Sequence, residues 1–335
     1  MQSRYIGARA VSRPAKTLSD QRVTGKAVSD AADITHLWKF WASAPQTARV
    51  GVFRGKRTST HHRFVRRAQL RSRALCEPHY LARAHLQTIA EENPVVWPAG
   101  TWQRRLEGHL FRHLGYFHVG GKHSPTSKIT RISATQDAME IWFSRVLDHQ
   151  IDGLANALPT WHPEDDSLAN GYPGLRYRLT LDGNGVEFYI LGKPCSVTFR
   201  GLEVAAFEDA CRIEIPDLEG ARTEQYMHRA ETLSDRPDEQ ETDVAVSAII
   251  RRAGVLLVGE ADSIDLWPTR PDRLSVEILT QDRSLATYSR IVSGLTSPHL
   301  SPRMTMTETA GHSGYRTIFQ IEGADVDIDL RIQTL

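Results

Sequence analysis

The side chains in this sequence best suited to chemistry are arginines near the N-terminal end. Residues 34–76 contain no Asp or Glu, so positive charge accumulates there without acidic neighbours along the chain. Lys and Arg neutralise phosphates and release counterions, which gives affinity for nucleic acid without base recognition. The predicted binding residues are Arg49, Arg54, Lys56, Arg57, Arg63, Arg66, Arg67, Arg71 and Arg73.

Several partners fit this basic run. The first is the backbone of DNA or RNA, with Phe53 and Phe64 placed among the arginines to stack on bases. The second is an acidic protein surface, including the acidic part of the same chain. Anionic lipid and a solvated helix face without any partner are the remaining alternatives. No RRM, KH or C2H2 zinc-finger pattern accompanies the run, so charge alone carries the prediction.

Part of the run is predicted to form an amphipathic helix over residues 61–75. At about 100° per residue, Phe64, Ala68 and Leu75 fall within about 40° of one another on a helical wheel. The five arginines of this range, Arg71 among them, are assigned to the other side. We therefore expect the helix to bury one face and to offer a basic face to a partner.

Histidines and cysteines form no recognised metal motif. His109 and His113 lie four residues apart and share a helical face, as metal ligands can. Cys76 and His79 form a CxxH pair, but no HExxH or paired CxxC motif is present. Isolated pairs of this kind are more often structural, so no metal site is predicted.

No catalytic signature appears either. The sequence lacks GxSxG, GxGxxG and protein-kinase motifs. The glycine-rich loop at residues 120–124 lacks the Gly and the Ser or Thr that a P-loop places around its Lys. We therefore predict no catalytic residue and no cofactor. An enzyme whose site residues lie far apart in the sequence stays an alternative.

The charge is divided along the chain. Residues 1–135 contain 23 basic and 7 acidic residues, whereas residues 136–335 contain 18 basic and 33 acidic residues. The predicted secondary structure changes along the chain together with the charge. We predict an α+β fold, with a basic, mainly helical N-terminal region followed by a mixed, sheet-rich, acidic C-terminal region.

Local patterns predict the elements that must position these side chains. Residues 134–157 are predicted to be helical. Residues 176–181 and 186–191 flank an Asp-Gly-Asn-Gly turn and predict a hairpin. Residues 325–332 alternate polar and apolar side chains, which predicts a half-buried final strand. We expect its aspartates to form a solvated face that resists aggregation rather than a cation site.

The predicted organisation has five parts, each defined by a change in composition. They are a basic flexible tail or transit-like segment at 1–33, a basic helical domain at 34–158, a hairpin-containing α+β region at 159–216, an acidic linker or loop at 217–243, and an α+β domain ending in an amphipathic strand at 244–335.

The sequence as a whole predicts a non-catalytic nucleic-acid-binding or assembly protein. A structural subunit of a secretion, organellar or ribonucleoprotein complex is the main alternative. Three widely spaced cysteines fit a reducing compartment, and no stretch is apolar enough to predict a membrane span. The expected location is the cytoplasm, or the mitochondrial matrix if residues 1–29 act as a transit peptide.

Overall fold

A computed structural model describes residues 60–88, 94–114, 117–118, 129–161, 168–214, 227–233, 241–258, 261–280, 284–310 and 315–334. Several predictions concern residues outside this part of the chain. They are the tail at 1–33, the glycine-rich loop at 120–124, Phe53, and the binding residues Arg49, Arg54, Lys56 and Arg57.

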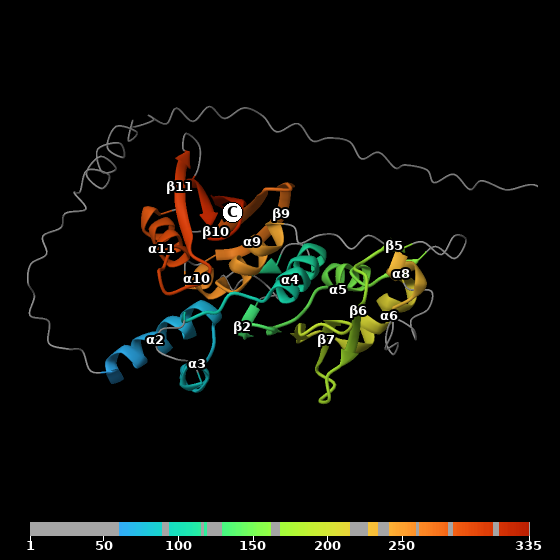
Figure 1. The fold of residues 1–335 in the computed structure, drawn as a ribbon. Helices are drawn as coiled ribbons and strands as arrows, with labels where there is room; N and C mark the ends of the chain where they lie inside the picture. Colours follow the sequence, from blue (N-terminus) through green and yellow to red (C-terminus); the bar gives the residue numbers. More distant parts are fainter. Residues whose placement is uncertain are drawn as a thin grey trace, which may run out of the picture. The chain divides into compact units, whose positions relative to one another are not determined.

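The predicted α+β class is confirmed in the described residues (Figure 1). The helices are α2 (Thr60–Leu75), α3 (His79–Gln87), α4 (Thr101–Leu114), α5 (Asp148–Asn156), α6 (Val204–Glu214), α8 (Arg229–Leu233), α9 (Glu241–Ile250), α10 (Ala253–Val258) and α11 (Leu285–Leu295). None of these helices is long and apolar enough to cross a membrane.

One sheet has five strands in the order β2-β3-β8-β7-β6. They are β2 (Ile129–Ala134), β3 (Ala138–Phe143), β6 (Leu175–Leu179), β7 (Gly185–Ile190) and β8 (Ser196–Arg200). The predicted hairpin is confirmed, since β6 and β7 pair antiparallel across the turn. Gly183 in that turn has φ +69°, a left-handed conformation that Gly adopts without steric cost. A separate pair joins β4 (Thr160–Trp161) and β5 (Leu168–Asn170).

The helix predicted across residues 134–157 is wrong in its first half. Residues 138–143 form β3, and only the later residues form α5. Met139, Ile141 and Phe143 are buried at alternate positions of β3, which is the period of a strand and not of a helix. The apolar run is short, and short runs fit both periods until packing selects one.

The other sheet has six strands in the order β1-β9-β10-β13-β12-β11. They are β1 (Phe117–His118), β9 (Ala261–Arg270), β10 (Arg273–Thr280), β11 (Met304–Ala310), β12 (Tyr315–Ile321) and β13 (Asp327–Thr334). The final strand was predicted correctly as a strand, and its Ile328, Leu330 and Ile332 are buried. It pairs in parallel with β10 and antiparallel with β12.

The expectation of a solvated aspartate face on β13 is wrong at its centre. Asp329 is only 1% exposed, and its two oxygens accept bonds of 2.7 and 2.8 Å from Arg316 of β12. Arg331 of β13 donates a further bond of 2.9 Å. Because β13 lies inside the sheet, arginines of the same and the neighbouring strand cover this carboxylate, and it protects no sheet edge.

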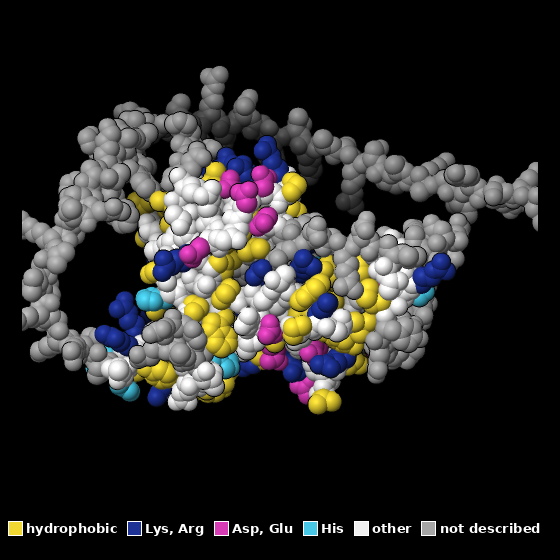
Figure 2. All heavy atoms as spheres, viewed as in Figure 1, with side chains coloured by type: hydrophobic (Ala, Val, Ile, Leu, Met, Phe, Trp, Pro, Cys, Tyr) yellow, Lys and Arg dark blue, Asp and Glu magenta, His cyan; other side chains and the backbone are white. Residues whose placement is uncertain are grey.

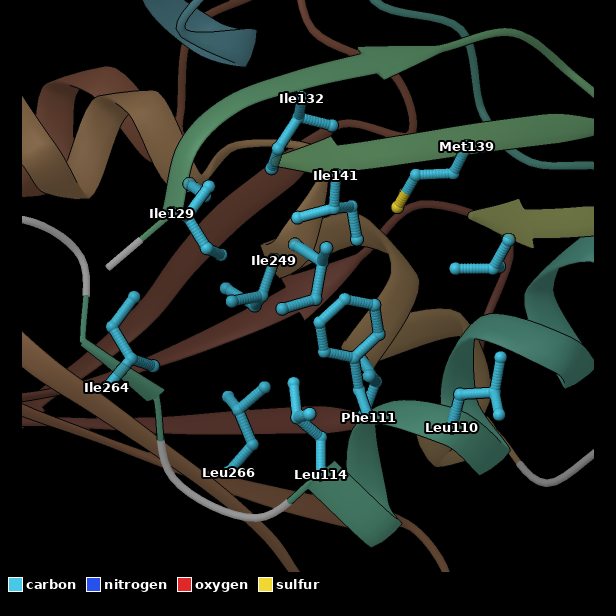
Figure 3. Packing of buried hydrophobic residues seen from close by; sticks show 14 of the residues in the cluster. Leu110, Phe111, Leu114, Ile129, Ile132, Met139, Ile141, Ile249, Ile264 and Leu266 are labelled. Atoms are coloured by element: carbon cyan, nitrogen blue, oxygen red, sulfur yellow. The ribbon is translucent and has the colours of Figure 1, made fainter. Parts of the chain in front are cut away.

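The two sheets share one hydrophobic core with α4 and α9. Figure 3 shows Phe111 of α4 and Ile249 of α9 lying close to Ile141 of β3, with Leu266 of β9 nearby. Residues on both sides of positions 158 and 243 belong to this cluster. The domain boundaries expected at those positions stay predictions.

The acidic segment 217–243 is in part folded. Residues 229–233 form α8, and Glu231 within it is fully buried. Thr242 and Asp243 in the first turn of α9 are buried as well. These described stretches are helical and contain buried polar residues, and the linker or loop expected over 217–243 as a whole stays a prediction.

Candidate nucleic-acid interface

Helices α2 and α3 form a helical hairpin, shown in blue and cyan in Figure 1. Cys76 ends α2 with φ +54°, the left-handed conformation that commonly terminates helices. Ala68 of α2 packs against Ala82 and Leu86 of α3, with Phe64 at the side of this small cluster. The hairpin therefore has its own apolar seam.

The C-terminal end of α2 docks on α10. Gly254 of α10 lies so close that an added Cβ would overlap the carbonyl oxygen of Arg73, and Ala74 is also adjacent. Ala74 and Leu75 enter the main core. This end of the helix is thus anchored on the rest of the protein, and the hairpin is held by two sets of contacts.

The structure separates the predicted arginines of α2 into two groups. Arg63, Arg66 and Arg73 are exposed, and Arg67 is half-buried. Among the described residues, Arg63, Arg66 and Arg73 form no hydrogen bond or ion pair. These three side chains are therefore open to an anionic partner.

The prediction that Arg71 belongs to the binding face is wrong. Arg71 is 1% exposed, and its Nε and Nη2 donate to the two carboxylate oxygens of Glu77 at 3.0 Å each. Its guanidinium also donates to the carbonyls of Val95 at 3.2 Å and Ala134 at 2.9 Å. Arg71 lies seven residues after Phe64, so the helical period itself places it on the buried side.

Both carboxylate oxygens of Glu77 are occupied by this internal ion pair. Its side chain is fully buried, and one of its oxygens also lies 3.1 Å from Nδ1 of His85. Glu77 is the only Asp or Glu in residues 60–88, which contain six arginines. The outside of the hairpin is consequently without a carboxylate of its own.

Sequence reasoning missed Arg83 of α3. Its side chain is exposed, and its guanidinium carbon lies 6.0 Å from the centre of the Phe64 ring. Ala82 and Leu86 point inward, and the 3.6-residue period places Arg83 at the border of this apolar stripe, where a long charged side chain can reach solvent. Figure 2 shows Lys, Arg and His side chains together at the lower left, where α2 lies. The exposed arginines of the two helices are Arg63, Arg66, Arg73 and Arg83, and we refer to this set together as the basic face.

Phe64 was predicted to stack on bases, but its ring is packed within the hairpin. It is half-buried against the seam of the hairpin and sits beneath Arg83. Its position on the apolar stripe of α2 explains this burial.

The histidine pair of α4 is structural. The rings of His109 and His113 lie 4.6 Å apart, and Nε2 of His109 is 2.8 Å from the carbonyl oxygen of Ala157. Burial, followed by the nearby His113, lowers the pKa of His109 to about 3. Within the described stretches, no three His, Cys, Asp or Glu side chains are grouped to hold a metal ion.

A second buried ionic cluster joins α4 to α9. Glu107 and Arg251 are 0% and 1% exposed, and Glu107 Oε1 accepts from Arg251 Nη2 at 2.6 Å and from Gln103 at 2.8 Å. Oε2 accepts from Ser247 at 2.5 Å and from Arg251 Nε at 3.2 Å. Arg251 also donates to the carbonyl of Thr135 at 2.6 Å. Because both oxygens have two donors each, this carboxylate is a structural anchor rather than a catalytic group.

A third cluster ties α8 to β6. Arg176 Nη1 and Nη2 donate to the two oxygens of Glu231 at 2.9 and 2.7 Å. The backbone amides of Gly174 and His228 each donate to Glu231 at 2.7 Å. Burial opposes ionisation of Glu231, but these hydrogen bonds outweigh it and lower its pKa. This pair also has a structural role.

No protein-family model, no curated protein and no solved structure matches this chain.

Proposed function

We propose that this protein is a non-catalytic nucleic-acid-binding protein that contacts the phosphate backbone through the basic face. The observation that carries the proposal is that Glu77, the one acidic residue of the hairpin, is buried. Arg71 holds Glu77 inside, so Arg63, Arg66 and Arg73 are exposed without a carboxylate from their own hairpin. Such a surface attracts polyanions.

The spacing on α2 suits a phosphate backbone. A helix rises about 1.5 Å per residue, so Arg63 and Arg73 are separated by about 15 Å along the axis. Neighbouring phosphates of one strand advance by about 3.4 Å along a duplex. The arginines of α2 are thus far enough apart to reach different phosphates. Guanidinium groups also match phosphate oxygens with two parallel hydrogen bonds.

The adjoining sequence supports the same partner. The acid-free stretch continues upstream through Arg49, Arg54, Lys56 and Arg57, which lie outside the described residues. An acid-free run this long favours a polyanion over a small patch of carboxylates on a protein.

The test is the salt dependence of binding to a random-sequence DNA duplex. The full chain should bind at about 50 mM salt, and the affinity should fall steeply as salt increases. The double variant Arg66→Gln/Arg73→Gln should reduce the slope of log K against log[salt] by about 2, or about 1 for each lost phosphate contact. Fluorescence anisotropy with a labelled duplex measures both quantities.

The matched control is Arg178→Gln/Arg212→Gln. These arginines lie outside the hairpin and are exposed; Arg178 pairs with Glu187 of β7, and Arg212 pairs with Asp209 of its own helix, α6. The control removes the same charge, so it should leave the slope at the wild-type value. The proposal fails if the wild-type chain does not bind at about 50 mM salt, where phosphate contacts are strongest. An equal loss of DNA affinity and salt slope in both double variants would also contradict the proposal. Binding would then depend on the net charge of the protein and not on the basic face.

A further inference from the structure

Helix α3 presents an exposed aromatic ring on the same hairpin. Tyr80 is 68% exposed, more than most large apolar side chains of the described residues. Its ring makes no hydrogen bond or ring contact within the described part of the chain. This exposure is unlike that of Phe64, whose ring is part of the hairpin seam.

The neighbours of Tyr80 leave its ring accessible and place a cation beside it. Arg83 and Ala84 follow it by three and four residues, and both are exposed. Side chains at these separations are neighbours on a helix surface, about 5–6 Å apart at Cβ. Ala84 is too small to cover the ring, and Arg83 can bind the phosphate next to a stacked base.

From this arrangement we infer that the hairpin binds single-stranded nucleic acid more tightly than duplex, with Tyr80 stacking on an unpaired base and Arg83 beside it. The inference rests on the proposed function. In a duplex both faces of a base are covered by its neighbours, whereas single strands offer base faces to aromatic side chains. Stacking tolerates any base, which fits a surface that lacks a base-reading motif.

The experiment compares a single-stranded oligothymidylate of ~12 nucleotides with a duplex of the same length, within the site sizes that single-strand binders use. Wild type should bind the single strand more tightly. Tyr80→Ala should weaken single-strand binding by about 5-fold or more, the loss expected for one stacked base. It should leave duplex binding unchanged. Tyr80→Phe should keep the wild-type affinity for the single strand, because it keeps the ring.

Leu181→Ala is the matched control, since Leu181 is an exposed apolar side chain in the β6–β7 turn. It should change neither affinity. The inference is overturned if Tyr80→Ala binds the single strand like wild type, or if it weakens single-strand and duplex binding equally. Either result leaves the proposed function standing. If wild type binds neither probe at low salt, the proposed function fails and the inference fails with it.

Discussion

Replacing Glu107 with Gln should destabilise the fold strongly. Glu107 is fully buried and accepts four hydrogen bonds, two of them from Arg251. Gln has the same shape but only one oxygen, so its amide nitrogen would face donors on one side. The guanidinium of Arg251 would stay buried without the carboxylate that neutralises it.

The magnitude follows from the burial of the pair. Removing one partner of a buried ion pair costs about 3–5 kcal/mol, because the other charge is left uncompensated. Whole domains are stabilised by only about 5–15 kcal/mol, so this is a large fraction. With about 2 °C of melting temperature for each kcal/mol in a chain of this size, Glu107→Gln should lower Tm by roughly 6–10 °C.

The assay is urea unfolding followed by tryptophan fluorescence and by far-UV circular dichroism, with coincident curves as the check on two-state behaviour. The matched control is Glu187→Gln. Glu187 pairs with Arg178, which is 65% exposed, so its loss should cost about 0–1 kcal/mol. If the two variants differ by less than about 0.5 kcal/mol, which is within the range of ordinary surface substitutions, the anchoring role of Glu107 is refuted.

Two further predictions concern stability. In the unfolded chain His109 takes up a proton as the pH falls below its ordinary pKa of 6.5. In the folded protein burial lowers this pKa to about 3. Unfolding free energy should therefore fall as pH drops from 6.5 towards 3, by up to about 1.4 kcal/mol per unit. Urea titrations at several pH values measure the slope of unfolding free energy against pH. His109→Gln should reduce this slope, whereas the control His79→Gln, at an exposed histidine, should not. Equal slopes in the two variants would contradict the role given to His109. Gly254→Ala should cost about 1–3 kcal/mol by pushing α2 from α10. Gly100→Ala, which meets only the movable tip of Asp137, should cost less, and a fully stable Gly254→Ala would contradict the docking.

Local patterns were enough to predict several elements. The Asp-Gly-Asn-Gly turn predicted the β6–β7 hairpin, because few residues tolerate the left-handed conformation at Gly183. The alternation in residues 325–332 predicted β13, and the spacing of Phe64, Ala68 and Leu75 predicted α2. Each signal depends only on residues that are close together in the chain.

The helical period of α2 also predicts the burial of one arginine. Arg71 falls on the apolar stripe of α2 by period alone, and its burial was therefore predictable in principle. What the period did not show is that Glu77 would meet it there and leave the outside of the hairpin without an acid. That outcome required the turn at Cys76 to bring Glu77 back towards α2.

Only the tertiary structure joined groups that are distant in the sequence. Glu107 and Arg251 are 144 residues apart, yet both are buried in one cluster. Asp329 became a buried carboxylate because β13 lies between β10 and β12. Periodicity shows which face of an element is apolar, and it contains no information on which other element covers that face. The choice of partner follows from how the chain as a whole buries its apolar surface and pairs the charges taken inside with it.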